Sequence, residues 1–153
     1  MSSTRPVSDI TAHIGFWLRM VSNHVSHAFA ARLADRKVTV AEWCLMRVLY
    51  GRDPLPPSRL AEEMGLSRGA ITRLADRLIA KSMILREAST VDRRAQTLAL
   101  TDRGRALVPD LAALADRNDA EFFECLPPRE RETLKRLLKS LAQRGHMTAI
   151  PIE

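Results

Sequence analysis

The side chains with the clearest potential for chemistry are arginines and short hydroxyl residues between Ser67 and Arg94. The segment from Leu66 to Arg94 holds seven basic side chains and three acidic ones, so it carries +4 of the chain's net charge of +6. A planar guanidinium group matches phosphate and guanine with paired hydrogen bonds. Groups of this kind in one short segment are typical of a surface that binds a nucleic acid.

The elements expected to position these side chains are two short helices joined by a tight turn. Ala61 is small enough to let two helices approach, and Gly65 suits the left-handed end of the first helix. Ser67 suits the N-cap of the second helix. Apolar residues then recur at a spacing of three and four, at Ile71, Leu74, Ala75 and Leu78. The opposite face keeps Arg68, Gly69, Thr72, Arg73 and Asp76. The pattern predicts a helix-turn-helix whose second helix reads the major groove of DNA.

A hairpin is expected to follow, because the period of the apolar pattern changes to two. The expected strands are 83–88 and 96–100, and the segment between them, 89–95, is too long for a two-residue turn. Its adjacent Arg93 and Arg94 suit a narrow, electronegative minor groove, and Asp92 is expected to orient Arg94 by charge pairing. A solvated charged loop is the alternative, which the preceding helix-turn-helix disfavours. The predicted DNA contacts are Ser67, Arg68, Gly69, Thr72, Arg73, Arg77, Asp92, Arg93 and Arg94.

Four stretches, which together span nearly the whole chain, resemble the MarR family of transcriptional regulators. They are 60–68, 71–78 followed by Lys81, 92–101 with Gly104, and Leu126-Pro127 before a Leu-rich helix. The third is the most specific, since Asp-any-Arg at the wing tip followed by Leu-any-Leu-Thr and a Gly is the family's signature. The resemblance implies a winged helix-turn-helix in a homodimer that binds a pseudo-palindromic operator and responds to a small, often anionic aromatic effector.

Helices are also expected on both sides of this segment. A long first helix is predicted from one apolar face, and Thr39 with Glu42 predicts a capping box for a second helix that runs to about Tyr50. Thr101 is expected to cap another long helix, and Pro127 and Pro128 to begin a last one. The apolar face of the first helix is Ile10, Ile14, Trp17, Leu18, Val21, Val25, Phe29 and Leu33.

The expected fold class is mainly α with a small β-wing, in a single chain of 153 residues. We expect a winged helix-turn-helix over 37–101, with the wing at about 84–100, and dimerisation helices over 8–36 and 102–145. The apolar faces of these terminal helices are wider than one small domain covers, and a two-fold dimer would bury them. The same symmetry would set two recognition helices about one DNA turn apart.

An effector crevice is the least defined of the expected sites. The resemblance implies a crevice between the dimerisation helices and the winged domain, and the first two helices offer aromatic and Met walls with one cation. The candidates are Trp17, Met20, His24, Trp43, Met46 and Arg47. The alternative is that these residues pack as helix core.

A redox switch and a metal switch are the alternatives to a ligand. Cys44 and Cys125 are too few and too far apart for a metal motif, and buried, inert thiols are the interpretation favoured over a redox-responsive regulator. His24 and His27 share a helix face, with help from His13, yet no third and fourth zinc ligands are evident, so no metal and no cofactor are expected.

The composition also bears on the remaining function classes. No Gly-rich phosphate loop, nucleophile elbow or spaced carboxylate pair is present, so catalysis is not expected. No apolar run approaches the ~18 residues that a membrane helix needs, and no signal peptide is visible, so a cytoplasmic location is expected. A non-specific architectural DNA binder stays an alternative, against which Thr72 and Arg73 on the exposed face favour base readout.

Overall fold

The chain folds into helices with one two-stranded antiparallel sheet, which confirms the expected fold class. The structure is a computed structural model and describes residues 5–153. In chain order the elements are a 3₁₀ turn η1 (Ile10–Ala12), α1 (Ile14–Ala34), α2 (Val40–Leu49), α3 (Pro57–Met64), α4 (Arg68–Ala80), β1 (Ile84–Ala88), β2 (Gln96–Leu100), α5 (Asp102–Phe123) and α6 (Pro128–Arg144).

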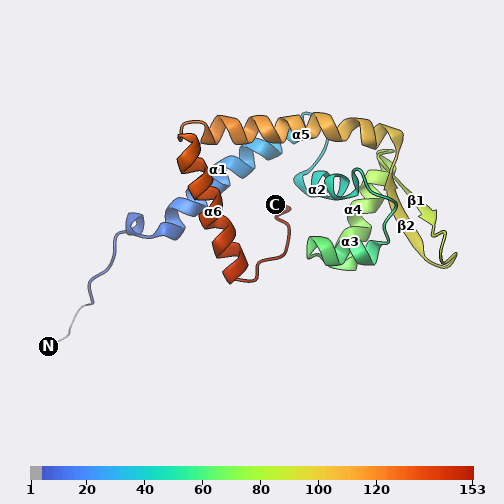
Figure 1. Cartoon of the computed structure of the whole chain (residues 1–153), viewed down its shortest axis with the longest axis horizontal. Coiled ribbons are helices and arrows are strands. Elements are labelled where there is room, and N and C mark those ends of the chain that lie inside the picture. Colours follow the sequence, from blue (N-terminus) through green and yellow to red (C-terminus); the bar gives the residue numbers. More distant parts are fainter. Residues whose placement is uncertain (1–4) are drawn as a thin grey trace.

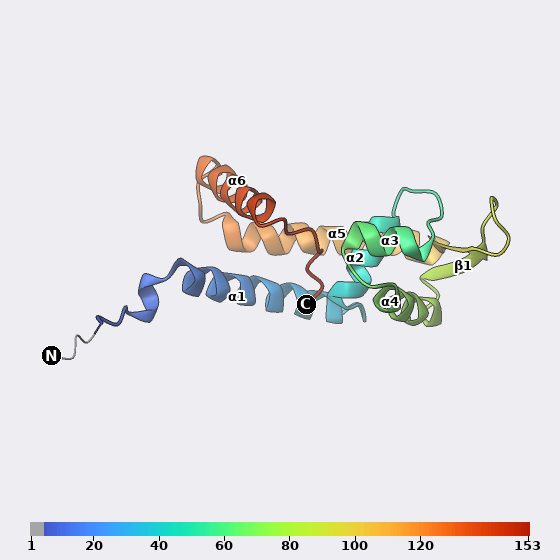
Figure 2. The ribbon, with the colours of Figure 1, turned by 90° about the horizontal axis from the view of Figure 1, so that it is seen from below.

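These elements form two ends that α5 joins. Helices α2, α3 and α4 with the hairpin form the winged end, and most of α1 lies with α6 at the other, which we call the arms (Figures 1 and 2). Helix α5 starts beside the hairpin and continues along α1 (Figure 1). Within residues 5–153 no helix is long and apolar enough to cross a membrane.

The helix ends are set by the residues that the sequence indicated. Gly65 ends α3 with φ 66° and ψ 32°, in the left-handed region where a residue with Cβ is strained. The hydroxyl of Ser67 accepts a hydrogen bond from the amide of Ala70, and that of Thr101 accepts one from Gly104. The turn of the helix-turn-helix and the start of α5 therefore follow local sequence signals.

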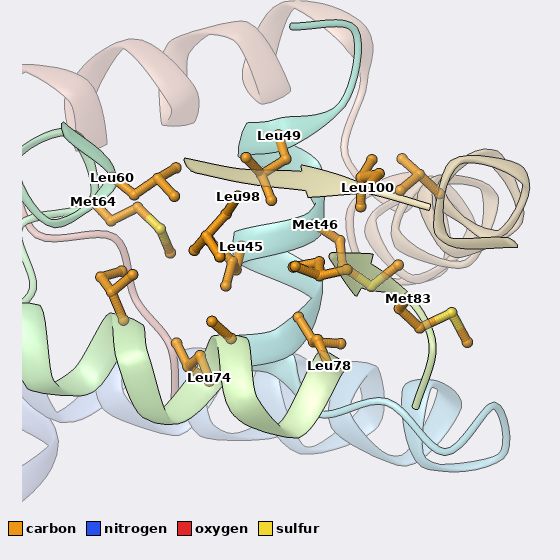
Figure 3. Close-up of a cluster of buried hydrophobic side chains, with 14 of the residues drawn as sticks. Leu45, Met46, Leu49, Leu60, Met64, Leu74, Leu78, Met83, Leu98 and Leu100 are labelled. Atoms are coloured by element: carbon orange, nitrogen blue, oxygen red, sulfur yellow. The ribbon is translucent and has the colours of Figure 1, made fainter. Parts of the chain in front are cut away.

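The hydrophobic core lies at the winged end (Figure 3). Leu45 of α2, Leu60 of α3, Leu78 of α4 and Leu98 of β2 are fully buried in it. The predicted apolar stripe of α4, namely Ile71, Leu74, Ala75 and Leu78, is buried as expected. Burial of this stripe fixes which face of α4 is left for solvent.

The predicted hairpin is present, and it pairs Ile84 with Leu100 at its base and Ala88 with Gln96 near its tip. Leu55 forms an isolated antiparallel bridge with Leu98 of β2. The Leu55 amide donates to the Leu98 carbonyl at 3.0 Å, and the Leu55 carbonyl accepts from the Leu98 amide at 2.8 Å. The loop before α3 is thereby fixed to the wing.

The first helix begins later than the sequence predicted. Helix α1 starts at Ile14, and His13 before it has an extended backbone at φ −92° and ψ 127°. Ile10 lies instead in η1, where the Asp9 carboxylate accepts from the amide of Thr11. A local cap at Asp9 therefore interrupts the periodic pattern. Farther along, α1 is joined to α5 by the buried Asn118, whose side-chain amide donates to the Val25 carbonyl at 3.2 Å.

The C-terminal tail, residues 147–153, returns to the winged end (Figures 1 and 2). The amide of Ile150 donates to the carbonyl of Met64 at 3.0 Å, and Ile150 packs against the core. A Cβ on Gly65 would lie 2.6 Å from the Cα of Ala149. Gly65 is thus required both for its left-handed backbone and for this close approach.

Candidate nucleic-acid interface

The exposed face of α4 carries most of the predicted DNA contacts. Burial of the opposite stripe leaves Arg68, Thr72, Arg73 and Arg77 exposed, with Ser67 and Gly69 at the N-terminal end of the helix. The Thr72 hydroxyl donates to the Arg68 carbonyl at 3.0 Å, so its oxygen keeps the capacity to accept a hydrogen bond. The arrangement offers several guanidinium donors along one exposed face of α4.

The arginines of this face and of the wing tip are free of internal partners. Among residues 5–153, no hydrogen bond or ion pair engages the guanidinium groups of Arg68, Arg73, Arg77, Arg93 and Arg94. Other arginines are paired, for example Arg86 with Asp76 of α4 and Arg105 with Asp102, each at 2.9 Å. Unpaired cations along one surface are available for an external anion.

The wing tip is organised through its backbone rather than through side-chain charges. The Asp92 carboxylate accepts from the backbone amide of Arg94 at 3.0 Å and forms no ion pair with the Arg94 guanidinium group within the residues described. The expectation of a charge pair is therefore corrected. An Asp side chain commonly closes a turn by bonding the amide two residues on. Asp92 shapes the loop and leaves the Arg94 side chain free.

The opposite, C-terminal end of α4 is bonded to other elements. Lys81, its C-cap, donates to the Glu42 carboxylate of α2 at 2.7 Å. The capping box predicted at Thr39 is therefore only half formed: the Thr39 hydroxyl accepts from the Glu42 amide at 3.1 Å, whereas the Glu42 carboxylate turns inward to Lys81. Local sequence spacing carried no sign of this contact.

The structure does not bring the six effector candidates together. Met46 is fully buried in the core, and Trp17 and Met20 lie half exposed on α1. The exposed His24 contacts the ring of Phe122 edge on, with centroids 5.1 Å apart. Trp43 and Arg47 line an open cavity of about 400 Å³ between α2, α3 and the tail. Its other walls, which sequence reasoning missed, are Cys44, Val48, Tyr50, Arg52, Glu63 and Ile150.

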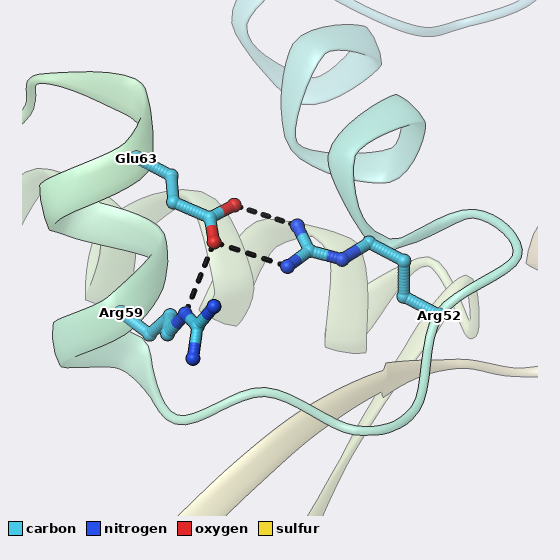
Figure 4. Close-up of polar contacts among 3 residues, drawn as sticks. All are labelled: Arg52, Arg59 and Glu63. Carbon is cyan, nitrogen blue, oxygen red and sulfur yellow. Dashed lines mark hydrogen bonds and ion pairs between the residues drawn. The ribbon is translucent and has the colours of Figure 1, made fainter.

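The two arginines that line this cavity, Arg47 and Arg52, have different partners, and Figure 4 shows those of Arg52. Arg52 holds both oxygens of Glu63 at 2.6 and 3.0 Å, and Arg59 adds a bond at 3.1 Å. The hydrogen bonds from Arg52 and then Arg59 lower the pKa of Glu63 to about 2, and Glu63 raises the pKa of Arg52. Arg47 lies 5.9 Å from the centroid of the Tyr50 ring and has no carboxylate partner among residues 5–153. Arg47 is thus the cation of this cavity that an anion can use.

The two thiols differ in exposure. Cys44 is half buried, burial raises its pKa, and its Sγ lies 3.7 Å from the Pro151 carbonyl of the tail. A raised pKa leaves less thiolate, the form that reacts with oxidants. Cys125, just after α5, is exposed, so the expectation of a buried thiol is wrong at this position. In the part of the chain described, no three His, Cys, Asp or Glu side chains group as metal ligands.

Comparison with known proteins bears on the whole arrangement. Residues 38–95 match the sequence model of the MarR family. A mutant MarR from E. coli complexed with operator DNA is 25% identical, with a TM-score of 0.76 over 88% of this chain and 99% of that one. CouR from Rhodococcus jostii RHA1 bound to p-coumaroyl-CoA is 27% identical, with a TM-score of 0.74 over 89% and 96% of the two chains. A probable transcriptional regulator from Pseudomonas aeruginosa is 26% identical, with a TM-score of 0.76 over 87% and 99%.

The match covers the helix-turn-helix and the wing arginines, and the structural likeness extends over the arms. Members of this family are transcriptional regulators and not enzymes. Residues 38–95 of the winged helix-turn-helix match the MarR family model, and the chain as a whole has the fold of MarR-type transcriptional regulators.

Proposed function

We propose that this chain is a homodimeric, ligand-responsive repressor that binds a pseudo-palindromic operator in double-stranded DNA. The observation that carries the proposal is the set of unpaired arginines on the exposed face of α4 and at the wing tip. Five free guanidinium groups on one protomer would draw strong, salt-dependent binding from phosphates. The operator complex of the 25% identical MarR mutant supports the same use of this fold here.

The contacts divide by position on the surface. Ser67, Arg68, Gly69, Thr72 and Arg73 surround the N-terminal end of α4 and would face base edges in the major groove. Arg77, farther along the same face, would contact phosphates. At the wing tip, Asp92 would hold the loop while Arg93 and Arg94 enter the flanking minor groove.

The exposed apolar surface of the arms is proposed to be buried against a second copy of the chain. On α1 the exposed fractions are 83% for Ile14 and 50% for Trp17, and on α6 they are 49% for Leu137 and 57% for Leu141. Large apolar side chains exposed on helices of this kind are typical of a protein interface. We assign dimerisation to 8–36 and 102–145, and DNA binding to 37–101. A two-fold axis through the arms would place two recognition helices on one face of the DNA.

Repression follows from occupancy, because a dimer spanning a promoter excludes RNA polymerase. A small anionic or aromatic effector would change the spacing of the recognition helices. The cavity at Trp43, Arg47 and Tyr50 offers two aromatic walls and one free cation for such a compound. The p-coumaroyl-CoA bound by the 27% identical CouR combines an aromatic ring with anionic groups, which supports this ligand class.

The decisive experiment is binding of the purified chain to a labelled fragment of its own upstream DNA, at about 0.15 M salt, against a shuffled competitor of equal length. Competitor-resistant binding with two chains per site would support the proposal. If random DNA selection also yielded no preferred sequence, the chain would be a non-specific architectural binder. Loss of operator binding on peroxide treatment in wild type, absent from Cys44→Ser/Cys125→Ser, would favour the redox-responsive alternative.

A further inference from the structure

Glu42 is a charged side chain with only 1% of its surface exposed, and DNA binding gives it no direct role. Its Oε2 lies 2.7 Å from Nζ of Lys81. A buried carboxylate without a partner is strongly destabilising, so this geometry is tightly constrained. Lys81 is the C-cap of α4, so the pair joins the end of the recognition helix to the first turn of α2.

The same ammonium group reaches a third element. Nζ of Lys81 also donates to the backbone carbonyl of Lys37, again at 2.7 Å. Lys37 lies between α1 and α2 and has a φ of 58°, a conformation that a non-glycine residue adopts only where its surroundings enforce it. One side chain thus links α4, α2 and the end of α1.

Neighbouring contacts hold the same end of α4 against α5. The hydroxyl of Thr101 donates to the carbonyl of Ser82 at 2.6 Å. The helical Gly104 packs so closely under Met83 that a Cβ there would lie 2.1 Å from the Met83 carbonyl oxygen. The recognition helix is therefore attached at its C-terminal end, next to the end of α1 and the start of α5, while its N-terminal end carries the candidate base contacts.

We propose that Lys81 is a positioning residue for DNA binding, which together with Glu42 sets the angle between the recognition helix and α1. The inference rests on the proposed function, because the angle between α4 and the arm would decide the spacing of the two recognition helices in a dimer. Hydrogen bonds to a buried charge fix direction, whereas apolar contacts at the same place tolerate sliding. Any shift of α1 reaches α4 through the Lys37 carbonyl.

Stability and positioning can be separated at this pair. Replacing both members of a buried ion pair with apolar residues of similar volume is often neutral or stabilising, whereas removing one member is costly. The test variant is therefore Glu42→Leu/Lys81→Met. Lys37→Met is the matched control, because it removes a neighbouring positive charge and keeps the carbonyl that Lys81 uses.

Two measurements are made on each folded variant, with thermal unfolding as the check of folding. The first is operator affinity at fixed salt. The second is the distance between spin labels at Ala30→Cys on α1 and Thr72→Cys on α4, in a Cys44→Ser/Cys125→Ser background. Labelled chain is mixed with excess unlabelled chain, so that the distance reports on one protomer. The label pair measures position without requiring DNA.

We expect the double variant to unfold no earlier than wild type, to show a shifted or broadened label distance, and to bind operator roughly 2-fold to 30-fold more weakly. Lys37→Met should match wild type in both measurements. A folded double variant with wild-type distance and affinity would overturn the inference. Should it not fold, the label distance is measured in Glu42→Leu, which removes the acceptor while the 37% exposed Lys81 side chain can still reach solvent; a wild-type value there would overturn the inference equally. Failure of wild type to bind any operator would instead count against the proposed function.

Discussion

The winged end and the arms of this molecule differ in how much of their apolar surface a single chain buries. The winged end has a closed core, in which Leu45, Leu60 and Leu98 are fully buried. Helix α6 has no buried residue, and Leu33 alone is buried in α1. The winged end is thus folded within one protomer, whereas the arms expose apolar surface. We infer that base specificity depends on one protomer and that the spacing of the two recognition helices depends on contacts between protomers.

Breaking the arms should therefore have the largest effect. Leu138→Asp/Leu141→Asp puts two charges into the exposed apolar face of α6, and we expect a monomer by analytical ultracentrifugation. Loss of the second half-site contact should weaken operator binding by about 10²-fold to 10⁴-fold. The helical circular dichroism of the winged end should persist. Gln143→Asp, on an exposed polar position of α6, is the control. A double variant that stays dimeric would refute this interface.

A core truncation should affect the winged end in a different way. Leu45→Ala removes a fully buried side chain and should lower the free energy of unfolding by about 2–5 kcal/mol, at every protein concentration. Leu137→Ala on α6 should instead act through the dimer, so its effect on denaturant unfolding should depend on protein concentration. If both variants behaved alike, the contrast between the two regions would fail.

Removing single DNA contacts should have smaller effects. Arg73→Ala and Arg94→Ala should each weaken operator binding by about 1–3 kcal/mol, with relaxed base preference for Arg73→Ala. Anisotropy titrations at fixed salt on operator and single-base variants measure both quantities. Arg105→Ala removes an arginine that is paired with Asp102 and is the matched control. Unchanged affinity for both test variants would remove these residues from the interface.

The smallest effect concerns acid stability at the winged surface. Glu63 has a pKa of about 2 in the folded chain, below its ordinary value of 4.5, because Arg52 and Arg59 bond its carboxylate. Its stabilising contribution is present above about pH 4.5 and is lost as pH falls toward 2. The difference in Tm between wild type and Glu63→Gln should therefore become smaller as the pH is lowered from about 4.5 toward 2. The neighbouring Glu62→Gln, without an ion pair among the residues described, should show no such narrowing.

The sequence predicted the parts of the fold that depend on short-range signals. Gly65 at the turn, the Ser67 and Thr101 caps and the two strands follow from residues close together in the chain, and the structure confirms them. Locally set features need only backbone preference and one side-chain hydrogen bond.

The features that sequence reasoning missed depend on residues distant in the chain. Glu42 has the spacing of a capping box, yet its carboxylate accepts a hydrogen bond from Lys81 instead. The part of the cavity wall that Ile150 forms had no signal in the neighbouring sequence. Trp43 and Met46 are three residues apart on α2, but one faces the cavity and the other the core, which helical period alone did not resolve.

The docked tail also has a consequence for the order of folding. The hydrogen bond from Ile150 to Met64 closes a long loop, whereas the bonds that build α3, α4 and the hairpin join near neighbours. Long-range closure costs more chain entropy and forms more slowly than local structure. During synthesis, the residues of the recognition helix therefore leave the ribosome before the tail residues that brace its preceding turn.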